Sequence, residues 1–338
     1  MTTGALILDD IDRAHAAIAP WVLKTPILEW TGNAKDALVG GKTRVVLKLE
    51  LFQKTGSFKA RGALCNMLAL DHIQRRAGVT AVSAGNHAIA VAYAAQALGV
   101  DAKVVMHKAA NPYRIGQCRE LGATIVLANN IQEAFAETAR IRDEEGRAVI
   151  HPFDGLATVT GTATLGVEFA RQATELGTPL DAVIVPVGGG GLIAGVATGF
   201  NQVGSTATVH GVEPEGAAGM CQSLAEGAPL TSVAVNTIAD SLGAPLHLPY
   251  SFALVRDLVR EIVVVSDVDL QDTMLVIFER MKLAVEPAAA AALAALAGPL
   301  RQALAGKTVG LVVCGANIDH ASFADHLAVA DMRREAAA

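Results

Sequence analysis

The sequence of 338 residues has few aromatic side chains and few cysteines, and each scarcity excludes a class of structure. Aromatic residues make up 4% of the chain and hydrophobic residues 52%, so the core has to consist mainly of Ala, Val, Leu and Ile. That composition suits buried parallel strands and closely packed helices. The four cysteines lie far apart and form no Cys-x-x-Cys pair, which argues against a disulfide framework or a zinc motif.

The sequence also lacks clustered positive charge and a long apolar run. It has 27 Lys and Arg against 33 Asp and Glu, a net charge of −6, which argues against nucleic acid as a partner. No apolar span of membrane-crossing length is free of both charge and proline, so no membrane helix is expected. Acidic residues follow Met1 too closely for a signal peptide, and we expect a cytoplasmic protein with reduced thiols.

Short apolar strands alternate with helical segments along most of the chain. Strands are expected at 45–49, 79–82, 102–106, 123–127, 148–150, 181–187, 208–212, 261–265 and 308–314. This alternation predicts an α/β fold whose sheets are mostly parallel, with helices on both faces. We expect a small unit at 76–150 and a discontinuous large unit at 1–75 plus 151–338. The last residues, 332–338, are expected to be a frayed tail.

A lysine follows a turn just before one of the expected helices, in Lys-Thr-Gly-Ser-Phe-Lys-Ala-Arg at 54–61. In one interpretation, Ser57 caps the helix and Lys59 is a solvated surface charge. In the other, the turn holds the Lys59 amine against a carbonyl group. The segment alone favours the first interpretation.

Four consecutive glycines, 188–191, stand between an apolar strand and a helix. Backbone N–H groups in such a loop can converge on one anion, and the helix N-terminus adds positive potential. The alternative is a tight left-handed turn, but a turn requires only one or two glycines. The loop has neither the Walker lysine nor the dinucleotide spacing, so a phosphate group is the expected guest.

Two further loops also follow expected strands. Residues 83–87, Ser-Ala-Gly-Asn-His, could hold a carboxylate through backbone N–H groups, or could be an ordinary capped helix start. Cys314 closes the last strand and, taken alone, is a small buried hydrophobic residue. A lysine, a phosphate cradle, a carboxylate loop and a polar residue at a strand end are together what a pyridoxal phosphate enzyme requires.

The chain resembles pyridoxal phosphate enzymes of fold type II, specifically the threonine/serine dehydratase and serine racemase group. The matching segments are 54–63, 83–88, 186–192, 285–288 (Val-Glu-Pro-Ala) and 314–317 (Cys-Gly-Ala-Asn). Their order and their positions at strand ends make the resemblance specific. It implies two three-layer α/β domains of the kind found in the tryptophan synthase β chain, and a homodimer or homotetramer.

The resemblance also implies the roles of individual residues. Lys59 forms the Schiff base with the cofactor and later takes the α-proton of the substrate. The other implied cofactor contacts are Phe58 beside the ring, Asn86 at the 3′-oxygen, Gly188, Gly189, Gly190 and Gly191 at the phosphate, and Cys314 at the pyridine nitrogen. The implied substrate contacts are Ser83, Ala84, Gly85, Asn86 and His87 at the carboxylate, with Glu286 at the substrate end of the pocket.

Departures from the pattern of the group bear on the reaction. Racemases of the group have a second serine where this chain has Ala84, and that serine is their acid/base opposite the lysine. A neutral thiol at Cys314 also cannot force the ring nitrogen to stay protonated, which suits β-elimination. We therefore expect a dehydratase (ammonia-lyase) that converts a β-hydroxy amino acid into a 2-keto acid and ammonia, with a serine racemase-like isomerase as the alternative.

Two further departures concern a metal and the substrate. Glu213 and Ala217 are weak candidate positions for the divalent cation that some members bind, but Gly219 stands where a second acid is expected, so no strong metal site is expected. The segments 161–164 and 237–243 also differ from the pattern of the group. We expect L-threonine or L-serine as the substrate, with phenylserine, hydroxyaspartate or a hydroxyectoine-pathway intermediate as the alternatives.

Overall fold

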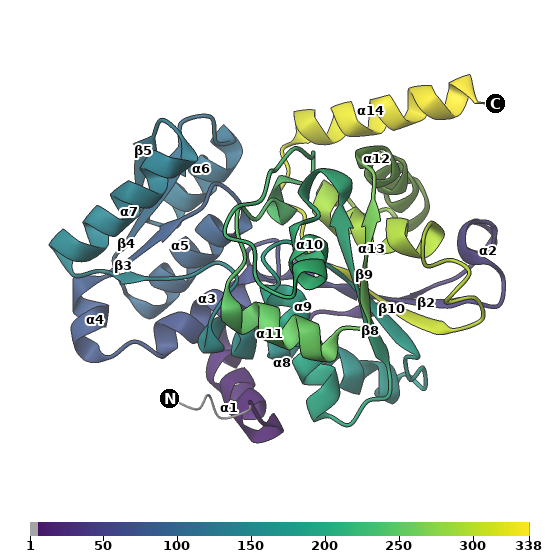
Figure 1. The fold of residues 1–338 in the computed structure, drawn as a ribbon, viewed down its shortest axis with the longest axis horizontal. Coiled ribbons are helices and arrows are strands. Elements are labelled where there is room, and N and C mark those ends of the chain that lie inside the picture. The colour runs from purple at the N-terminus through teal and green to yellow at the C-terminus, as the bar shows by residue number, and fades with distance from the viewer. Residues whose placement is uncertain (1–5, 338) are drawn as a thin grey trace.

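The computed structural model describes residues 6–337, in which two β-sheets lie in separate parts of the molecule (Figure 1). The larger sheet has six strands in the order β1-β2-β10-β7-β8-β9. All neighbours are parallel except β1, which pairs antiparallel with β2 at one edge. The strands are β1 Ile27–Trp30, β2 Arg44–Leu49, β7 Ala182–Pro186, β8 Thr208–Pro214, β9 Glu261–Val265 and β10 Thr308–Val313.

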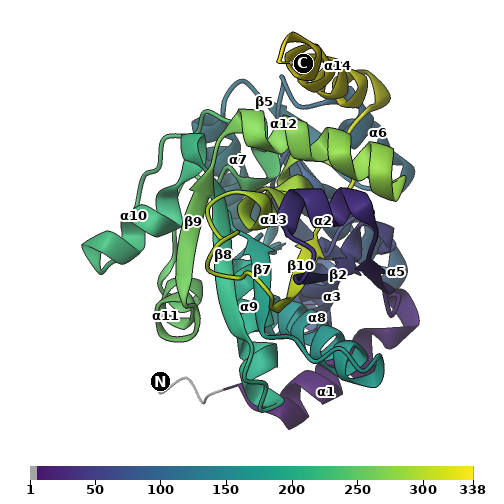
Figure 2. The same cartoon turned by 90° about the vertical axis from the view of Figure 1, so that its right-hand side faces the viewer.

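Helices cover both faces of the larger sheet (Figure 2). One face packs against α8 and α9, and the other against α13, which contacts β7, β8, β9 and β10. The helix α13 is Ala-rich and buried from Pro287 to Leu296, so it can lie close to the strands. The helices of this part are α1 Leu8–Ile18, α2 Asn33–Val39, α3 Lys59–Leu68, α8 Leu156–Glu175, α9 Gly191–Gln202, α10 Gly219–Glu226, α11 Pro249–Leu258, α12 Asp267–Val276, α13 Pro287–Ala297 and α14 His320–Ala336.

The smaller sheet has four parallel strands in the order β5-β4-β3-β6. On β4, Val104 packs into the core that includes α5, whereas its neighbour Val105 packs with Ala134 and Ile141 of α7, so helices cover both faces. The elements are β3 Val79–Val82, β4 Ala102–His107, β5 Thr124–Ala128, β6 Ala148–Val149, α4 His72–Ala77, α5 Asn86–Leu98, α6 Pro112–Glu120 and α7 Ile131–Glu145. The helix α3 contacts both α5 and α8 and so joins the two parts.

The predicted fold class, α/β with mostly parallel sheets, is confirmed. All strands of the smaller sheet come from residues 79–149, while the predicted domain boundaries stay a prediction. The strand β1 was not predicted, because it is short and follows Pro26. Within residues 6–337, no helix is both long and apolar enough to cross a membrane.

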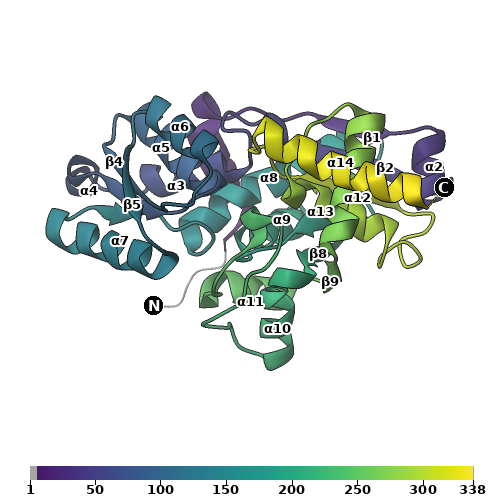
Figure 3. The same cartoon turned by 90° about the horizontal axis from the view of Figure 1, so that it is seen from above.

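The prediction of a frayed C-terminal tail was wrong for residues 332–336, which continue α14. The helix α14 lies along α12 (Figure 3). Residue 338 lies outside the described part of the chain. Asp319 caps the helix by accepting hydrogen bonds from the N–H groups of Ala321 and Ser322. Near the other end, Arg333 pairs with Asp272 of α12, which holds the last turns in place.

Candidate active site

The loops that follow β3, β6, β7 and β10 converge on one crevice. This is the geometry expected of parallel sheets, whose ligands bind beyond the carboxyl ends of the strands. The innermost part of the crevice is lined by residues from several of these loops together with Lys59: Phe58, Asn86, Phe153, Gly188, Gly189, Gly190, Gly191, Leu242, Glu286 and Cys314. It adjoins a wider cavity of about 570 Å³ that is also lined by Lys59.

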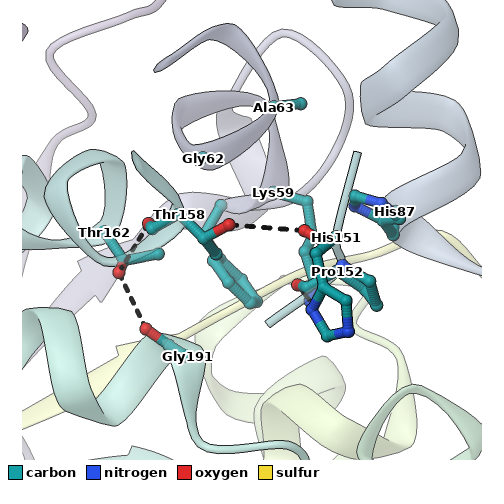
Figure 4. A pocket seen from close by; sticks show the side chains of 10 residues that line it. Lys59, Gly62, Ala63, His87, His151, Pro152, Thr158, Thr162 and Gly191 are labelled. Carbon is teal, nitrogen blue, oxygen red and sulfur yellow. Dashed lines mark hydrogen bonds between the residues drawn. The ribbon is translucent and has the colours of Figure 1, made fainter. Parts of the chain in front are cut away.

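Lys59 is the first residue of α3, and its side chain points into the crevice (Figure 4). Its Nζ donates a hydrogen bond of 2.5 Å to the carbonyl oxygen of Pro152 and lies 5.2 Å from the ring centroid of Phe58. Burial lowers the pKa of Lys59 to about 8, although the acidic groups of Cys314 and Glu286 act in the opposite direction. A larger fraction of this amine is therefore neutral near pH 7 than of a solvated lysine.

A buried ion cluster anchors the first turn of α3 to the larger sheet. The guanidinium of Arg61, with no exposed surface, binds Glu50 through Nε at 3.0 Å and Nη2 at 2.8 Å. It also binds Glu168 of α8 through Nη1 at 3.2 Å, and Lys48 of β2 pairs with the same carboxylate. Because Arg61 lies two residues after Lys59, these contacts fix where the lysine side chain begins.

The four glycines form the turn from β7 into α9. Gly190 has a φ of 90°, in the left-handed region that glycine adopts freely, and Gly191 begins α9. A Cβ atom added to Gly189 would lie 2.2 Å from the ring of Phe153, so no side chain fits there. Thr162 of α8 donates a hydrogen bond of 2.7 Å to the carbonyl oxygen of Gly191 (Figure 4). A turn of backbone N–H groups at a helix N-terminus can hold a phosphate.

Asn86 lies in a chain of buried side-chain amides and acids. Its Oδ1 accepts a hydrogen bond of 2.7 Å from Asn317, whose amide also donates to the Thr55 carbonyl at 2.8 Å. Its Nδ2 donates to Oε1 of Glu286 at 2.7 Å. Burial raises the pKa of Glu286 to about 7, and its Oε2 is enclosed without a hydrogen-bond partner in the described chain. The network sets the orientation of the Asn86 amide at the crevice.

Cys314 is the residue directly after β10, and it faces the crevice from a strand end. Its carbonyl oxygen accepts a hydrogen bond of 3.1 Å from the N–H of Phe58, and Ser57 forms an isolated β-bridge with Gly315. The lysine segment and the cysteine segment are therefore held side by side. Burial raises the pKa of the Cys314 thiol well above its ordinary value, so the thiol is neutral.

The loop 83–87 lies at the start of α5 and lines the wider cavity together with Lys59. The hydroxyl of Ser83 accepts a hydrogen bond of 3.1 Å from the N–H of Gly85, which tightens the turn. Ala84 presents only a methyl group to this wall of the cavity. The predicted cofactor and substrate residues thus line the crevice and the adjoining cavity, and Lys59 and Asn86 line both.

The two weak metal candidates do not line the crevice or the cavity. The buried carboxylate of Glu213 accepts hydrogen bonds of 2.8 Å from the N–H groups of both Met220 and Cys221, in the first turn of α10. Burial raises its pKa to about 7. Ala217 lies in a short 3₁₀ turn before that helix. Among residues 6–337, no cluster of three or more His, Cys, Asp and Glu side chains has a metal-binding arrangement.

Sequence reasoning missed several residues that line the cavity: Arg114, His151, Asp240 and Ser241. The signal for His151 was present, because it directly follows the expected strand at 148–150 and strand ends carry ligands. Asp240 lies in the segment 237–243, which differs from the pattern of the group, but Arg114 gave no local signal. They meet only in the folded chain, where the guanidinium and carboxylate form a bidentate ion pair with one bond of 3.2 Å.

These residues fit one kind of cofactor. A partly neutral lysine amine can add to an aldehyde, the glycine turn can hold a phosphate, and a neutral thiol suits a pyridine nitrogen. The fold and the site together define an enzyme that uses an aldehyde cofactor carrying a phosphate group. The family described as "Pyridoxal-phosphate dependent enzyme" matches residues 18–315, and the chain belongs to this family.

Comparisons with individual proteins agree with this family assignment. The chain is 51% identical to phenylserine dehydratase of Ralstonia pickettii, over 96% of this chain and 98% of the relative. It is 35% identical to the catabolic L-threonine dehydratase of Escherichia coli K12, over 92% and 93% of the two chains. The structure of maize serine racemase superposes with a TM-score of 0.87 at 35% identity, covering 98% of this chain and 99% of that chain.

These relatives confirm several predictions made from the sequence. The chain is a fold type II enzyme of the threonine/serine dehydratase and serine racemase group. Its cofactor is pyridoxal 5′-phosphate, and it is a pyridoxal-phosphate-dependent ammonia-lyase. An amino acid is its substrate.

Proposed function

We propose that this ammonia-lyase acts on a β-hydroxy amino acid with an aryl side chain, of the phenylserine type, and releases an aryl 2-keto acid and ammonia. The observation that carries the proposal is the apolar wall of the wide cavity beyond Lys59. That wall is built from both parts of the molecule by Ile131, Phe135, Val149, Ile150, Phe153, Pro245, Leu246 and Leu248. The Ralstonia relative, which is named for phenylserine, supports the same substrate class.

The size and polarity of the cavity favour an aryl group over a methyl group. Its volume of about 570 Å³ is far more than the side chain of threonine needs, and the eight side chains named above give it an extended apolar wall. Burying an apolar surface against such a wall stabilises a bound ligand by roughly 25 cal/mol per Å². A methyl group would leave much of this surface unused.

The charges around the cavity argue against a second carboxylate on the substrate, as in hydroxyaspartate. Apart from Lys59, the lysines and arginines lining it in the described chain are Arg114 and Arg142. Arg114 forms a bidentate pair with Asp240, and Arg142 binds both carboxylate oxygens of Asp143, at 2.6 and 2.9 Å. Both cations are therefore already matched by acids of the chain.

Each residue of the site has a role in this proposal. When bound, pyridoxal phosphate supplies an aldehyde that holds the substrate amine and a ring that takes up the electron pair left at Cα. Lys59 binds the cofactor and then takes the α-proton with its amine. The backbone N–H groups of residues 83–87 orient the substrate carboxylate, and those of Gly188–Gly191 hold the phosphate.

The same geometry supports elimination rather than racemisation. A racemase needs a second acid/base on the face opposite the lysine, and the methyl group of Ala84 can neither give nor take a proton. Lys59 then works from one face of the substrate only. At Ala84, no acid/base group stands opposite it to return a proton to Cα from the other face. The β-hydroxyl then takes up a proton and leaves as water, and hydrolysis of the released enamine gives the 2-keto acid and ammonia.

A panel of substrates tests this function. We expect kcat/KM for phenylserine to exceed that for threonine by at least about tenfold, because an apolar pocket discriminates by roughly 1–3 kcal/mol for each missing group. Ammonia and keto acid are measured for L- and D-isomers of phenylserine, threonine, serine and hydroxyaspartate. Phe135→Ala removes part of the apolar wall, and we expect it to reduce this preference while changing threonine turnover little.

Three results would count against the proposal. A preference for threonine or serine would reject the aryl substrate, and a preference for hydroxyaspartate would show that the cavity accepts a second carboxylate. Interconversion of enantiomers without ammonia would reject the lyase in favour of the isomerase.

We further propose that residues 76–150 form a small domain that closes over the substrate. Polar contacts between this segment and the rest of the chain, together called the clasp below, support closure. Arg114 of α6 pairs with Asp240, and its Nε donates to the carbonyl oxygen of Asn317 at 3.0 Å. Nearby, Nδ2 of Asn111 donates to Asp319 at 2.6 Å.

Asp240→Asn weakens the clasp without changing its shape. We expect KM to rise by up to about fivefold with kcat nearly unchanged, because Asp240 is exposed and such pairs contribute roughly 0.2–1 kcal/mol. Asp257→Asn, which breaks a surface pair with Arg256 outside the cavity, is the control. Equal KM values for the two variants would mean that the clasp does not assist substrate binding.

A homodimer or homotetramer in the cytoplasm completes the proposal. Apolar side chains exposed at α12 and α14, such as Val268 at 47% and Met332 at 61%, support a contact between copies. Free thiols at the four cysteines are in keeping with a reducing compartment. Light scattering of the purified protein measures the assembly.

A further inference from the structure

Two histidines beside Lys59, His87 and His151, each have one ring nitrogen in a hydrogen bond with the backbone. In His87 that nitrogen donates, and in His151 it accepts. Nε2 of His87 lies 2.8 Å from the carbonyl oxygen of Ile150. A carbonyl oxygen only accepts, so this Nε2 has to carry the proton. Nδ1 of His151 accepts from the N–H groups of Phe153 at 3.4 Å and Asp154 at 3.0 Å, so this Nδ1 has to be bare.

Each ring therefore carries a single proton whose position is known. Burial lowers the pKa of His87 to about 3 and that of His151 to about 4, and the charge of Lys59 acts in the same direction on both. Both imidazoles are therefore neutral near pH 7. The remaining nitrogen of His87, Nδ1, is thus an acceptor, and the remaining nitrogen of His151, Nε2, is a donor.

Both histidines line the substrate cavity. The two residues line the same cavity as Lys59, and Figure 4 shows both rings next to Lys59 and Pro152. Neither nitrogen has a hydrogen-bond partner among residues 6–337. Neither is among the fully enclosed side-chain atoms that lack a partner in the described chain.

One acceptor and one donor on residues that line the same cavity match a hydroxyl group, which offers one proton and lone pairs. A carboxylate would use only the donor, and a chloride or a methyl group would leave the acceptor unpaired. We propose that His87 Nδ1 and His151 Nε2–H together bind the β-hydroxyl group of the substrate, His87 accepting its proton and His151 donating to its oxygen. This inference rests on the proposed function and names the part of the site that selects a hydroxyl as the leaving group.

Two substitutions of His151 separate the donor from the structural role of the ring. Asn retains an acceptor close to the position of Nδ1 and removes the donor. Gln retains an N–H donor close to the position of Nε2 and removes the acceptor used by residues 153 and 154. Each variant is assayed with phenylserine and with β-chloroalanine, whose chloride leaves without accepting a strong hydrogen bond.

We expect His151→Asn to lower kcat/KM for phenylserine by about tenfold, as the loss of one hydrogen bond implies, and to change β-chloroalanine elimination less than about threefold. His151→Gln retains phenylserine turnover. His87→Gln is a second test, on another element. It retains a donor for the Ile150 carbonyl and loses the Nδ1 acceptor, and we expect it to lower phenylserine turnover selectively, as His151→Asn does. Visible absorbance of the bound cofactor shows that each variant is loaded and folded.

The opposite pattern would overturn the inference. If His151→Asn is as active as the wild type while His151→Gln is not, the ring serves only the turn at 153–154. If the variants lose both substrates equally, the histidines do not recognise the hydroxyl. A wild type that releases ammonia from β-chloroalanine but from no β-hydroxy amino acid would reject the proposed function itself, a result distinct from both.

Discussion

Replacing Lys59 with alanine is expected to abolish ammonia release, lowering kcat/KM by roughly 10⁴-fold, the upper range for loss of a catalytic base. The variant is also expected to lose the visible absorbance of the lysine-bound cofactor. The fold should survive, because the side chain makes a single hydrogen bond, to Pro152, and Arg61 holds the helix. Lys54→Ala, at an exposed lysine of the same loop, is the matched control and should leave both properties unchanged.

The pH at which the wild type takes up the cofactor gives a second measure of Lys59. Only a neutral amine adds to an aldehyde, and burial disfavours the ammonium form, which lowers its pKa to about 8. Uptake by the cofactor-free protein should therefore rise with pH up to about 8 and level off above it. A rise centred near ~10.4, the pKa of a solvated lysine, would mean that Lys59 is not desolvated. Turnover by the Lys59→Ala variant would mean that Lys59 is not the catalytic base.

Gly191→Ala is expected to reduce the affinity for pyridoxal phosphate by about 10- to 100-fold. A Cβ atom at this position would lie 2.3 Å from the carbonyl oxygen of Phe153 and 2.8 Å from its Cα, both backbone atoms that cannot rotate away. Displacing a packed backbone costs typically about 1–3 kcal/mol. The displaced loop also carries the Pro152 carbonyl that holds Lys59. Titration of the cofactor-free protein by visible absorbance measures the loss.

Gly116→Ala is the control for this substitution. Gly116 lies inside α6, and a Cβ atom there meets nothing within 4 Å, so alanine should bind the cofactor normally and stabilise the helix by about 0.5–1 kcal/mol. Equal cofactor affinity in Gly191→Ala and Gly116→Ala would mean that the glycine turn is not a close-fitting cradle.

The central strands were predictable because they are short, apolar and separated by helices. The strand β7 is buried at every residue, as its uninterrupted apolar sequence requires. The edge strand β1 escaped prediction because four residues at the sheet edge need no such pattern. The end of α14 escaped it because the stability of that helix comes partly from contacts with α12, which are distant in sequence.

The loops of the site were predictable for a different reason. Gly188–Gly191 and Cys314 lie at the carboxyl ends of expected strands. Because such ends meet at one edge of a parallel sheet, their positions in the sequence already place them together. The pair Arg114–Asp240 could not be inferred, because 126 positions separate the two residues and Arg114 lies in no distinctive local pattern. The proton positions of His87 and His151 were equally hidden, since they depend on which backbone groups each ring meets.

The buried cluster of Arg61, Glu50, Glu168 and Lys48 has a consequence for how the protein is made. Its members come from β2 and its end, from α3 and from α8. Glu50 alone can pair with Arg61, but two cations face this one carboxylate until Glu168 of α8 joins them and pairs with Lys48. Leaving any of them unpaired in the interior is costly, so their assembly is cooperative. During synthesis, a chain that has not yet reached α8 cannot hold Lys59 in place, and the ability to capture the cofactor appears late, as a mark of completed folding.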